Sequence, residues 1–220
     1  WQFINMFISL WDYSTGENTD IATLYDKNKS EETATIKKEL GVVIPFTETP
    51  IQESIGENMY INMIRRANRY IYITSPYLII TWEMEKALIS AAKSGVDVRI
   101  ITPHIPDKKY VHLLTRSFYK NLVENGVKIY EFEKGFIHAK NCICDDEFVV
   151  IGSINLDYRS LYLHFECAVW TYGAPIITDV KEDFENTLKQ SLKITPEWVK
   201  SRNLITRILQ SLLRLFAPLM

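Results

Sequence analysis

Two side chains suited to reactions at phosphorus lie close together in residues 138–155, HAKNCICDDEFVVIGSIN. His138 and Lys140 are two residues apart in a run that favours a β-strand. Because successive strand side chains alternate between faces, the spacing predicts that both point the same way, about 7 Å apart. An imidazole can attack phosphorus or transfer a proton near neutral pH, and an ammonium group offsets the charge of a phosphoryl oxygen.

Small polar residues follow a second apolar run, 148–151. Gly152 lets the backbone approach a ligand closely, while Ser153 and Asn155 supply neutral hydrogen-bond donors. The stretch has no arrangement that is typical of a metal site. The sequence therefore predicts phosphoryl chemistry that uses no metal and no other cofactor.

Six positions of this stretch resemble the HKD motif of the phospholipase D superfamily: His138, Lys140, Asp145, Gly152, Ser153 and Asn155. Four further segments resemble the second HKD half of bacterial cardiolipin synthases: 74–77 (TSPY), 95–100 (GVDVRI), 155–160 (NLDYRS) and 164–166 (HFE). The resemblance extends over residues 42–220, and residues 11–17 look like the end of a preceding half. It implies an active site that joins two such halves.

The resemblance implies a role for each motif residue. In the superfamily one histidine attacks phosphorus to give a phosphohistidine, and the other protonates the leaving alcohol and deprotonates the incoming one. As part of a second half, His138 takes the acid–base role, with Lys140 as a catalytic phosphate contact. Ser153 and Asn155 would bind phosphoryl oxygens. The alternatives are a histidine bonded to a backbone carbonyl, a solvated lysine and a polar turn.

An acid–base imidazole needs its second nitrogen held, usually by a carboxylate. In the family a glutamate in an N-F-E-like segment does this, and His164-Phe165-Glu166 is the similar segment here, with His in place of the common Asn. Glu166 is therefore the third expected catalytic residue. The alternative is an exposed glutamate on a strand.

Two motif residues are expected to be structural. Gly152 permits close approach, and Asp145 stands at a strand end, where its carboxylate can pair with a cation or cap a turn. Metal sites at the acidic run 145–147, or among Cys142, Cys144 and Cys167, lack the usual ligand spacing, so we expect none. Tyr77 and His104 are candidates for lining the substrate channel, since each follows the end of a predicted strand.

Composition limits the remaining choices. With 220 residues, 47% of them hydrophobic, the chain can bury one sizeable core. The net charge of −2 gives no general attraction for nucleic acid, so no nucleic-acid partner is expected. Cys142 and Cys144 are too close along one strand for a mutual disulfide, which favours a reducing, cytoplasm-facing environment. No apolar run has the roughly 18 residues of a membrane-spanning helix.

Apolar periodicity alternates between strands and helices. The expected strands are 42–44, 70–75, 96–102, 127–132, 137–144, 147–151 and 165–172, and the expected helices are 51–68, 82–94, 107–125 and 176–192. Gly95 and Gly126 follow two of these helices, as C-terminal caps do. The pattern predicts an α/β domain with a mixed sheet and helices on both faces, like a phospholipase D half-domain.

Four segments are expected along the chain: a terminal helix of a preceding half-domain at 1–12, a polar linker at 13–41 with a short helix near 31–40, the HKD domain at 42–200, and a basic amphipathic helix at 201–220. The start within an apolar pattern suggests part of a longer protein. The last helix can lie on an anionic membrane surface or pack on the domain, and the chain is expected to be soluble or peripheral.

These observations favour a phosphatidyltransferase that makes cardiolipin from two phosphatidylglycerol molecules and releases glycerol. Its expected partners are anionic phospholipid, a membrane surface and a second HKD half, from the same parent chain or from a homodimer. The expected location is the cytoplasmic face of a bacterial membrane. The alternatives are a phospholipase D or single-motif endonuclease working as a homodimer, and a non-catalytic half that only docks.

Overall fold

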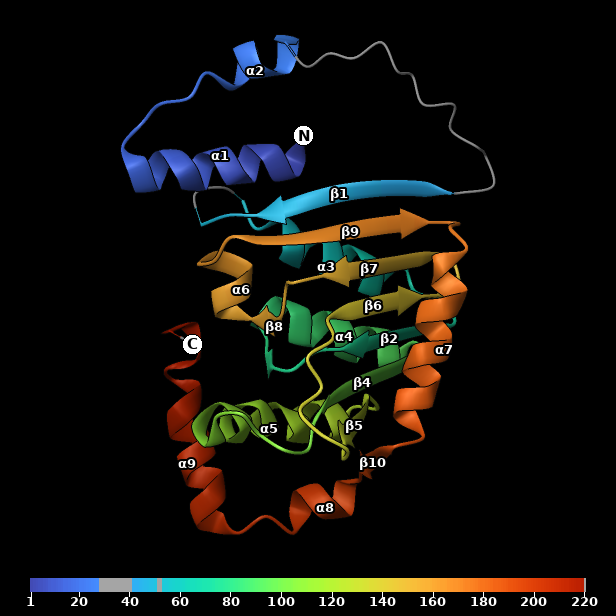
Figure 1. The fold of residues 1–220 in the computed structure, drawn as a ribbon. Coiled ribbons are helices and arrows are strands. Elements are labelled where there is room, and N and C mark those ends of the chain that lie inside the picture. Colours follow the sequence, from blue (N-terminus) through green and yellow to red (C-terminus); the bar gives the residue numbers. More distant parts are fainter. Residues whose placement is uncertain (28–40, 51–52, 220) are drawn as a thin grey trace.

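The computed structural model describes residues 1–27, 41–50 and 53–219. A mixed sheet of eight strands runs through it in the order β1-β9-β7-β6-β2-β4-β5-β10 (Figure 1). Its strands are β1 (Val42–Glu48), β2 (Tyr70–Thr74), β4 (Asp97–Pro103), β5 (Lys128–Phe132), β6 (Asn141–Cys144), β7 (Phe148–Gly152), β9 (Glu166–Tyr172) and β10 (Ser191–Ile194). The short strands β3 (Leu78–Ile79) and β8 (Leu156–Asp157) form a separate parallel pair.

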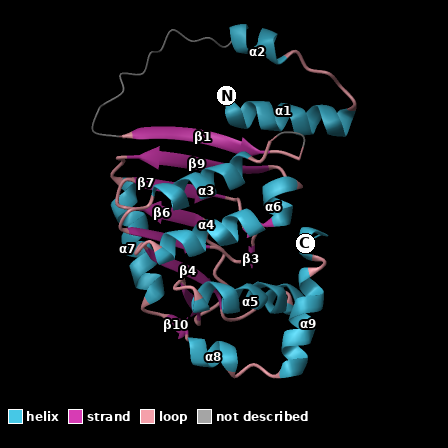
Figure 2. Cartoon of the chain, turned by 180° about the vertical axis from the view of Figure 1, so that it is seen from behind, coloured by secondary structure: helices cyan, strands magenta, loops and turns pink. Residues whose placement is uncertain are grey.

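Helices cover both faces of the sheet. One face carries α3 (Ile55–Arg66), α4 (Trp82–Lys93) and α5 (Lys109–Glu124), which Figure 2 shows in front of the strands, and the other carries α7 (Ile176–Leu188). The remaining helices are α1 (Gln2–Thr15), α2 (Ile21–Lys27), α6 (Tyr158–Tyr162), α8 (Pro196–Lys200), α9 (Leu204–Arg214) and the 3-10 turn η2 (Ala217–Leu219).

Strand alternation divides the core into two layers. Ile71 and Ile73 of β2 belong to the larger cluster beneath α3, α4 and α5. Tyr70 and Tyr72 of the same strand face α7, where the Tyr72 ring stacks on Phe184 at 4.8 Å between centroids. A strand buried on both faces reads as a continuous apolar run, as β2 does. The predicted fold class, a mixed sheet with helices on both faces, is confirmed.

Several element boundaries differ from the sequence prediction. β1 continues through Pro45 to Glu48, because it is an edge strand and proline is tolerated where no second neighbour needs its missing N–H. The helix expected to reach residue 192 ends at Leu188, and β10 follows as the opposite edge. The short elements β3, β8, α6 and α8 were not predicted, since two to five residues carry no measurable periodicity.

The prediction of a strand over 137–144 is wrong in its first half. β6 begins at Asn141, which pairs with Thr74 at the end of β2. Ser75 donates its backbone N–H to Ile101 of β4, as alternate residues of a central strand do, and Pro76, which would next face the segment before Asn141, has no N–H to donate. His138 and Lys140 therefore lie in an extended loop that leads into β6.

The terminal segments also differ in part. The first helix runs to Thr15, past the expected end at residue 12, and lies against β1 with Ile8 buried. The polar segment 13–41 contains α2, and the helix expected near 31–40 lies outside the described residues. The C-terminal helix occupies Leu204–Arg214, within the expected range.

A carboxylate fastens the β6–β7 turn to the start of β2. Asp145 is buried, and its side chain accepts the backbone N–H groups of Asn68 at 2.6 Å, Arg69 at 2.9 Å and Tyr70 at 2.8 Å. Asp145 and Asp146 both have positive φ angles, 55° and 63°, which Asp tolerates better than most residues. The expected structural role of Asp145 matches this geometry.

We predict that Asp145→Asn lowers the free energy of unfolding by about 1–3 kcal/mol, because an amide nitrogen then faces a buried donor. Asp146→Asn is the matched control. It keeps the same backbone preference and an oxygen that can accept from the Tyr70 hydroxyl, and it removes the same charge from a side chain that is 42% exposed, where each ion pair, with Arg69 and with Lys181, contributes less than about 1 kcal/mol. Urea unfolding measures both, and equal losses would contradict the assignment.

Candidate active site

The motif residues surround an open pocket of about 510 Å³ where β6 begins and β7 ends. His138, Lys140, Gly152, Ser153, Asn155 and Glu166 all line it. Because Asn141 pairs with the last residue of β2, the pocket lies at the carboxyl end of β2, where α/β proteins place ligands. The structure therefore brings all six of these predicted residues together.

His138 and Lys140 differ in exposure although they are two residues apart. His138 is exposed, its ring makes no hydrogen bond with any residue that the structure describes, and it lies 5.6 Å from the ring of Phe136. The Lys140 side chain is only 9% exposed and donates from Nζ to the backbone oxygen of His138 at 2.6 Å. The free imidazole and the nearly buried ammonium thus share one side of the pocket.

Carboxylates counteract the burial of Lys140. Burial lowers the pKa of Lys140 from its usual value, and the negative charges of Glu166 and then Asp157 partly oppose that shift. Asp157 is itself buried, which raises its pKa, while its side chain accepts the backbone N–H of Ser160 at 2.7 Å. An anion entering the pocket would meet a lysine with a single backbone contact.

Glu166 is held by hydroxyl groups. Its Oε2 accepts a short hydrogen bond from Ser153 Oγ, and its Oε1 accepts one from Ser160 Oγ at 3.0 Å. His164 Nδ1 lies 3.6 Å from the same Oε1. Between the described residues there is no direct hydrogen bond from Glu166 to His138. The carboxylate lines the pocket beside the imidazole but is oriented by its own serines.

This network uses the donors that were expected to hold phosphate. Ser153 Oγ gives its proton to Glu166 and accepts the N–H of Cys167 at 3.0 Å. Asn155 Nδ2 donates to Ser160 Oγ at 2.9 Å, and its buried Oδ1 has no hydrogen-bond partner among the residues that the structure describes. Ser153 thus has no spare proton in this arrangement, whereas Asn155 keeps a second N–H and a free oxygen. Phosphate binding by either residue stays a prediction.

Gly152 allows β7 and β9 to approach each other. It pairs with Ala168, and a Cβ atom on Gly152 would meet the backbone oxygen of Cys167 and lie 2.5 Å from Ala168 Cα. No side chain fits there without moving the strand that carries Glu166. Gly152 therefore lets β7, which leads to Ser153, lie close enough to β9 for Ser153 to contact Glu166.

The two substrate-lining candidates lie outside the pocket. Tyr77 donates to Asp107 Oδ2 at 2.6 Å and lines a separate pocket, although its ring is 6.3 Å from that of Phe136, the neighbour of His138. His104 Nδ1 lies 2.8 Å from Glu131 Oε2, in a buried ion cluster with Arg116. The hydrogen bond with Glu131 holds the His104 ring away from the active-site pocket.

Sequence reasoning missed two residues of the network, Ser160 and Asp157. Both stand in the NLDYRS run, whose resemblance was noted without a role for either residue. The residue type offered a signal, because Asp is a favoured helix N-cap residue, and Asp157 caps α6 by accepting the backbone N–H of Ser160. That cap presents the Ser160 hydroxyl to Glu166.

The three cysteines are free thiols, with Cys142 and Cys144 buried in β6. Within the part of the chain that the structure describes, no group of three or more His, Cys, Asp or Glu side chains is placed to hold a metal ion. No helix there is long and apolar enough to span a membrane.

The fold and the arrangement of the motif residues define a phospholipase D-like domain. The sequence model of the family described as "Cardiolipin synthase, PLD-like domain" matches residues 60–188. The chain belongs to this family, and the resemblance drawn from the motif is confirmed.

Relatives and solved structures agree with this assignment. The chain is 44% identical over 219 residues to an uncharacterized protein of Streptococcus mutans, covering 99% of the chain and 46% of the relative. It is 35% identical over 215 residues to a cardiolipin synthase of Halalkalibacterium halodurans, covering 98% and 42%. The chain thus spans less than half the length of these relatives.

Two crystal structures share the fold. Nuc of Salmonella typhimurium, described as a phospholipase D family member, is 20% identical with a TM-score of 0.60, covering 70% of this chain and 99% of Nuc. Phosphatidylserine synthase of Haemophilus influenzae is 16% identical with a TM-score of 0.62, covering 80% of this chain and 45% of the synthase.

We predict that Gly152→Ala lowers the free energy of unfolding by about 1–3 kcal/mol. Replacing glycine with alanine at an unstrained φ normally stabilises a protein slightly, because it restricts the unfolded chain. Here we expect the steric overlap of the new Cβ with β9 to outweigh that gain. The double variant Gly152→Ala/Ala168→Gly should not recover the loss, since backbone atoms of Cys167 and Ala168 remain in the way. Thermal unfolding of both variants and of Ala168→Gly tests this, and full recovery in the double variant would refute it.

Proposed function

We propose that this chain supplies the second HKD half-site of a phosphatidyltransferase that makes cardiolipin from two phosphatidylglycerol molecules and releases glycerol. The observation that carries the proposal is the exposed, unbonded imidazole of His138 at the mouth of a pocket that also holds Lys140 and Glu166. Membership of the cardiolipin synthase family supports the lipid substrate. The near-neutral charge of the chain supports it over a nucleic-acid substrate.

In the first half-reaction a histidine of the other half attacks the phosphorus of one phosphatidylglycerol. A P–N bond forms and the P–O bond to glycerol breaks, while protonated His138 gives its proton to the departing glycerol oxygen. In the second half-reaction neutral His138 removes the proton from the hydroxyl of another phosphatidylglycerol. That oxygen attacks phosphorus, the P–N bond breaks, and cardiolipin is released.

The neighbours of His138 suit these steps. Lys140 is close enough to bond the His138 backbone oxygen, and its charge lowers the energy of the phosphoryl oxygens as they become more negative. Glu166 places a carboxylate in the same pocket, where its negative charge favours the protonated form of Lys140. Ser153 and Ser160 act as positioning residues, because their hydroxyls fix the direction of that carboxylate.

The complete site requires a second HKD half, from the same polypeptide or from a second copy. The relatives, about twice as long as this chain, support a partner half within one polypeptide. We place the enzyme at the cytoplasmic face of a bacterial membrane, where free thiols persist. The alternative is hydrolysis by a phospholipase D or a homodimeric endonuclease. The reaction products distinguish hydrolysis from phosphatidyl transfer.

The test uses the complete gene product that carries this chain, incubated with phosphatidylglycerol. We expect cardiolipin and glycerol in equal amounts, and a loss of about 10²–10⁴-fold in rate for His138→Ala. Lys134→Ala, an exposed lysine in the same loop, is the control and should retain full activity. Phosphatidic acid as the main product would mean hydrolysis, and full activity of His138→Ala would remove this residue from the site.

A further inference from the structure

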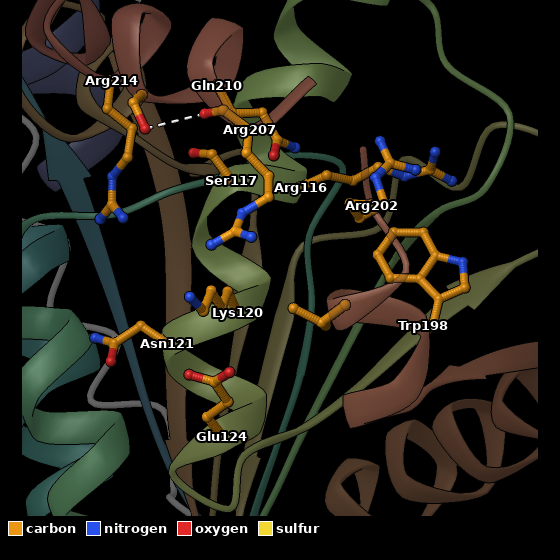
Figure 3. A pocket seen from close by; sticks show the side chains of 12 residues that line it. Arg116, Ser117, Lys120, Asn121, Glu124, Trp198, Arg202, Arg207, Gln210 and Arg214 are labelled. Atoms are coloured by element: carbon orange, nitrogen blue, oxygen red, sulfur yellow. Dashed lines mark hydrogen bonds between the residues drawn. The ribbon is translucent and has the colours of Figure 1, made fainter. Parts of the chain in front are cut away.

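A second cavity, of about 400 Å³, lies between α5, α8 and α9 and shares no residue with the active-site pocket (Figure 3). Five cationic side chains line it: Arg116, Lys120, Arg202, Arg207 and Arg214. Among the described lining residues only Glu124 is acidic. The cavity therefore carries a local positive charge on a chain whose net charge is −2.

Two of the five cations have acidic partners outside the cavity. Arg116 pairs with Glu131 at 2.5 Å, and Arg214 pairs with Glu85 at 3.2 Å. The other three form no ion pair with any residue that the structure describes: Lys120, Arg202 and Arg207. Figure 3 shows Arg207 extending from α9 into the cavity toward α5, where Lys120 lies.

The positive charges are crowded around one indole ring. Arg202 lies 4.8 Å from the centroid of the Trp198 ring, and Arg116 lies 5.3 Å from the same centroid. Burial lowers the pKa of Arg202, and the repulsion from Arg116 lowers it further. An anion in the cavity would relieve this repulsion and accept charge-assisted hydrogen bonds from the guanidinium groups.

Helix α9 attaches to the domain through its polar side. Gln210, 9% exposed, donates from Nε2 to the backbone oxygen of Leu113 at 3.2 Å. The Arg214 guanidinium lies 4.1 Å from the centroid of the Phe118 ring. Gln210 and Arg214 therefore point at the protein, and Leu213 also packs against the core.

The apolar face of α9 and of the turn after it points outward. Its side chains are between 47% and 79% exposed: Ile205, Ile208, Leu209, Leu212, Leu215 and Phe216. A contiguous apolar stripe of this kind on a domain surface marks an interaction site. Its position beside unpaired cations combines the two features of helices that lie in an anionic bilayer interface.

We propose that α9 and the basic cavity form a docking site for a bilayer that contains anionic phospholipid. The apolar face of α9 enters the interface, and the phosphate of one lipid headgroup binds Lys120, Arg202 and Arg207. Charge complementarity favours a membrane over a protein segment, because a purely apolar partner would leave these three cations unmatched. The turn η2 that follows α9 contacts α6, the helix that carries Ser160, so docking holds the active site near the lipid.

This inference does not require the proposed reaction, and vesicle flotation of the 220-residue chain tests it without turnover. We expect binding to phosphatidylcholine vesicles that contain phosphatidylglycerol, little binding to phosphatidylcholine alone, and weaker binding as salt increases. Lys120→Gln/Arg207→Gln should weaken binding about 10–30-fold. Ile208→Ser/Leu212→Ser should weaken it at least about tenfold.

Matched controls separate the site from general charge and hydrophobicity. Lys93→Gln/Lys189→Gln removes two exposed lysines on α4 and after α7, and Ile176→Ser/Leu192→Ser removes two apolar side chains that are 42% and 43% exposed. Both controls should bind like the unchanged chain, as should His138→Ala, which separates docking from catalysis.

Three results would overturn the proposal. The first is no binding to vesicles that contain phosphatidylglycerol. The second is an equal loss of binding in the controls and in the site variants. The third is self-association of the chain, without vesicle binding, that Ile208→Ser/Leu212→Ser abolishes, because the stripe would then be a protein interface.

Discussion

The position of the hairpin that brings Lys140 and Gly152 to the candidate site depends on one carboxylate that the chemistry does not use. Asp145 binds three consecutive backbone N–H groups at the start of β2 and so fixes the β6–β7 turn against the central strand. A slip of one residue would turn each side chain of the hairpin to the opposite face. Because the Asp145 hydrogen bonds hold one end of the short β6–β7 hairpin, they determine where its other end lies. That end carries Lys140 and Gly152. The acidic residue of the motif is thus a scaffold for the basic ones.

Much of the fold followed from the sequence, since long apolar runs and helix-ending glycines such as Gly95 report burial and chain reversal directly. What failed depended on pairing between distant strands. Residues 137–140 do not pair with β2, because the residue that would next face them is Pro76, which has no N–H to donate. In the site, the motif located His138 and Glu166, but their expected contact is replaced by the bonds of Ser153 and Ser160 to the carboxylate. Which of several nearby donors bonds to the carboxylate depends on the three-dimensional arrangement, and residue spacing along the chain does not predict it.

In our proposal, the two sites on this domain divide the work of an enzyme that acts on lipid. The pocket at β6 and β7 offers an imidazole, an ammonium and a carboxylate, which suit proton transfer at a phosphodiester. The cavity beside α9 offers three cations that form no ion pair with the described residues, together with an apolar stripe, and these suit holding a lipid surface. Packing on the domain alone does not explain the α9 helix, because Gln210 and Arg214 face the domain while most of its apolar side chains are exposed. In our account the first site needs a second HKD half to be complete, whereas the second does not.

The assignment of His138 to proton transfer is tested most directly with a phosphatidyl donor whose leaving group, p-nitrophenol, needs no acid. With the complete gene product carrying His138→Ala, the account predicts a burst of about one p-nitrophenol per enzyme followed by a stall, since attack proceeds but no base activates the acceptor. Peptide mass spectrometry after an alkaline quench should then find the phosphatidyl group on a histidine outside residues 1–220. No burst from the variant, together with a phosphatidyl group on His138 of the unchanged enzyme, would contradict the account.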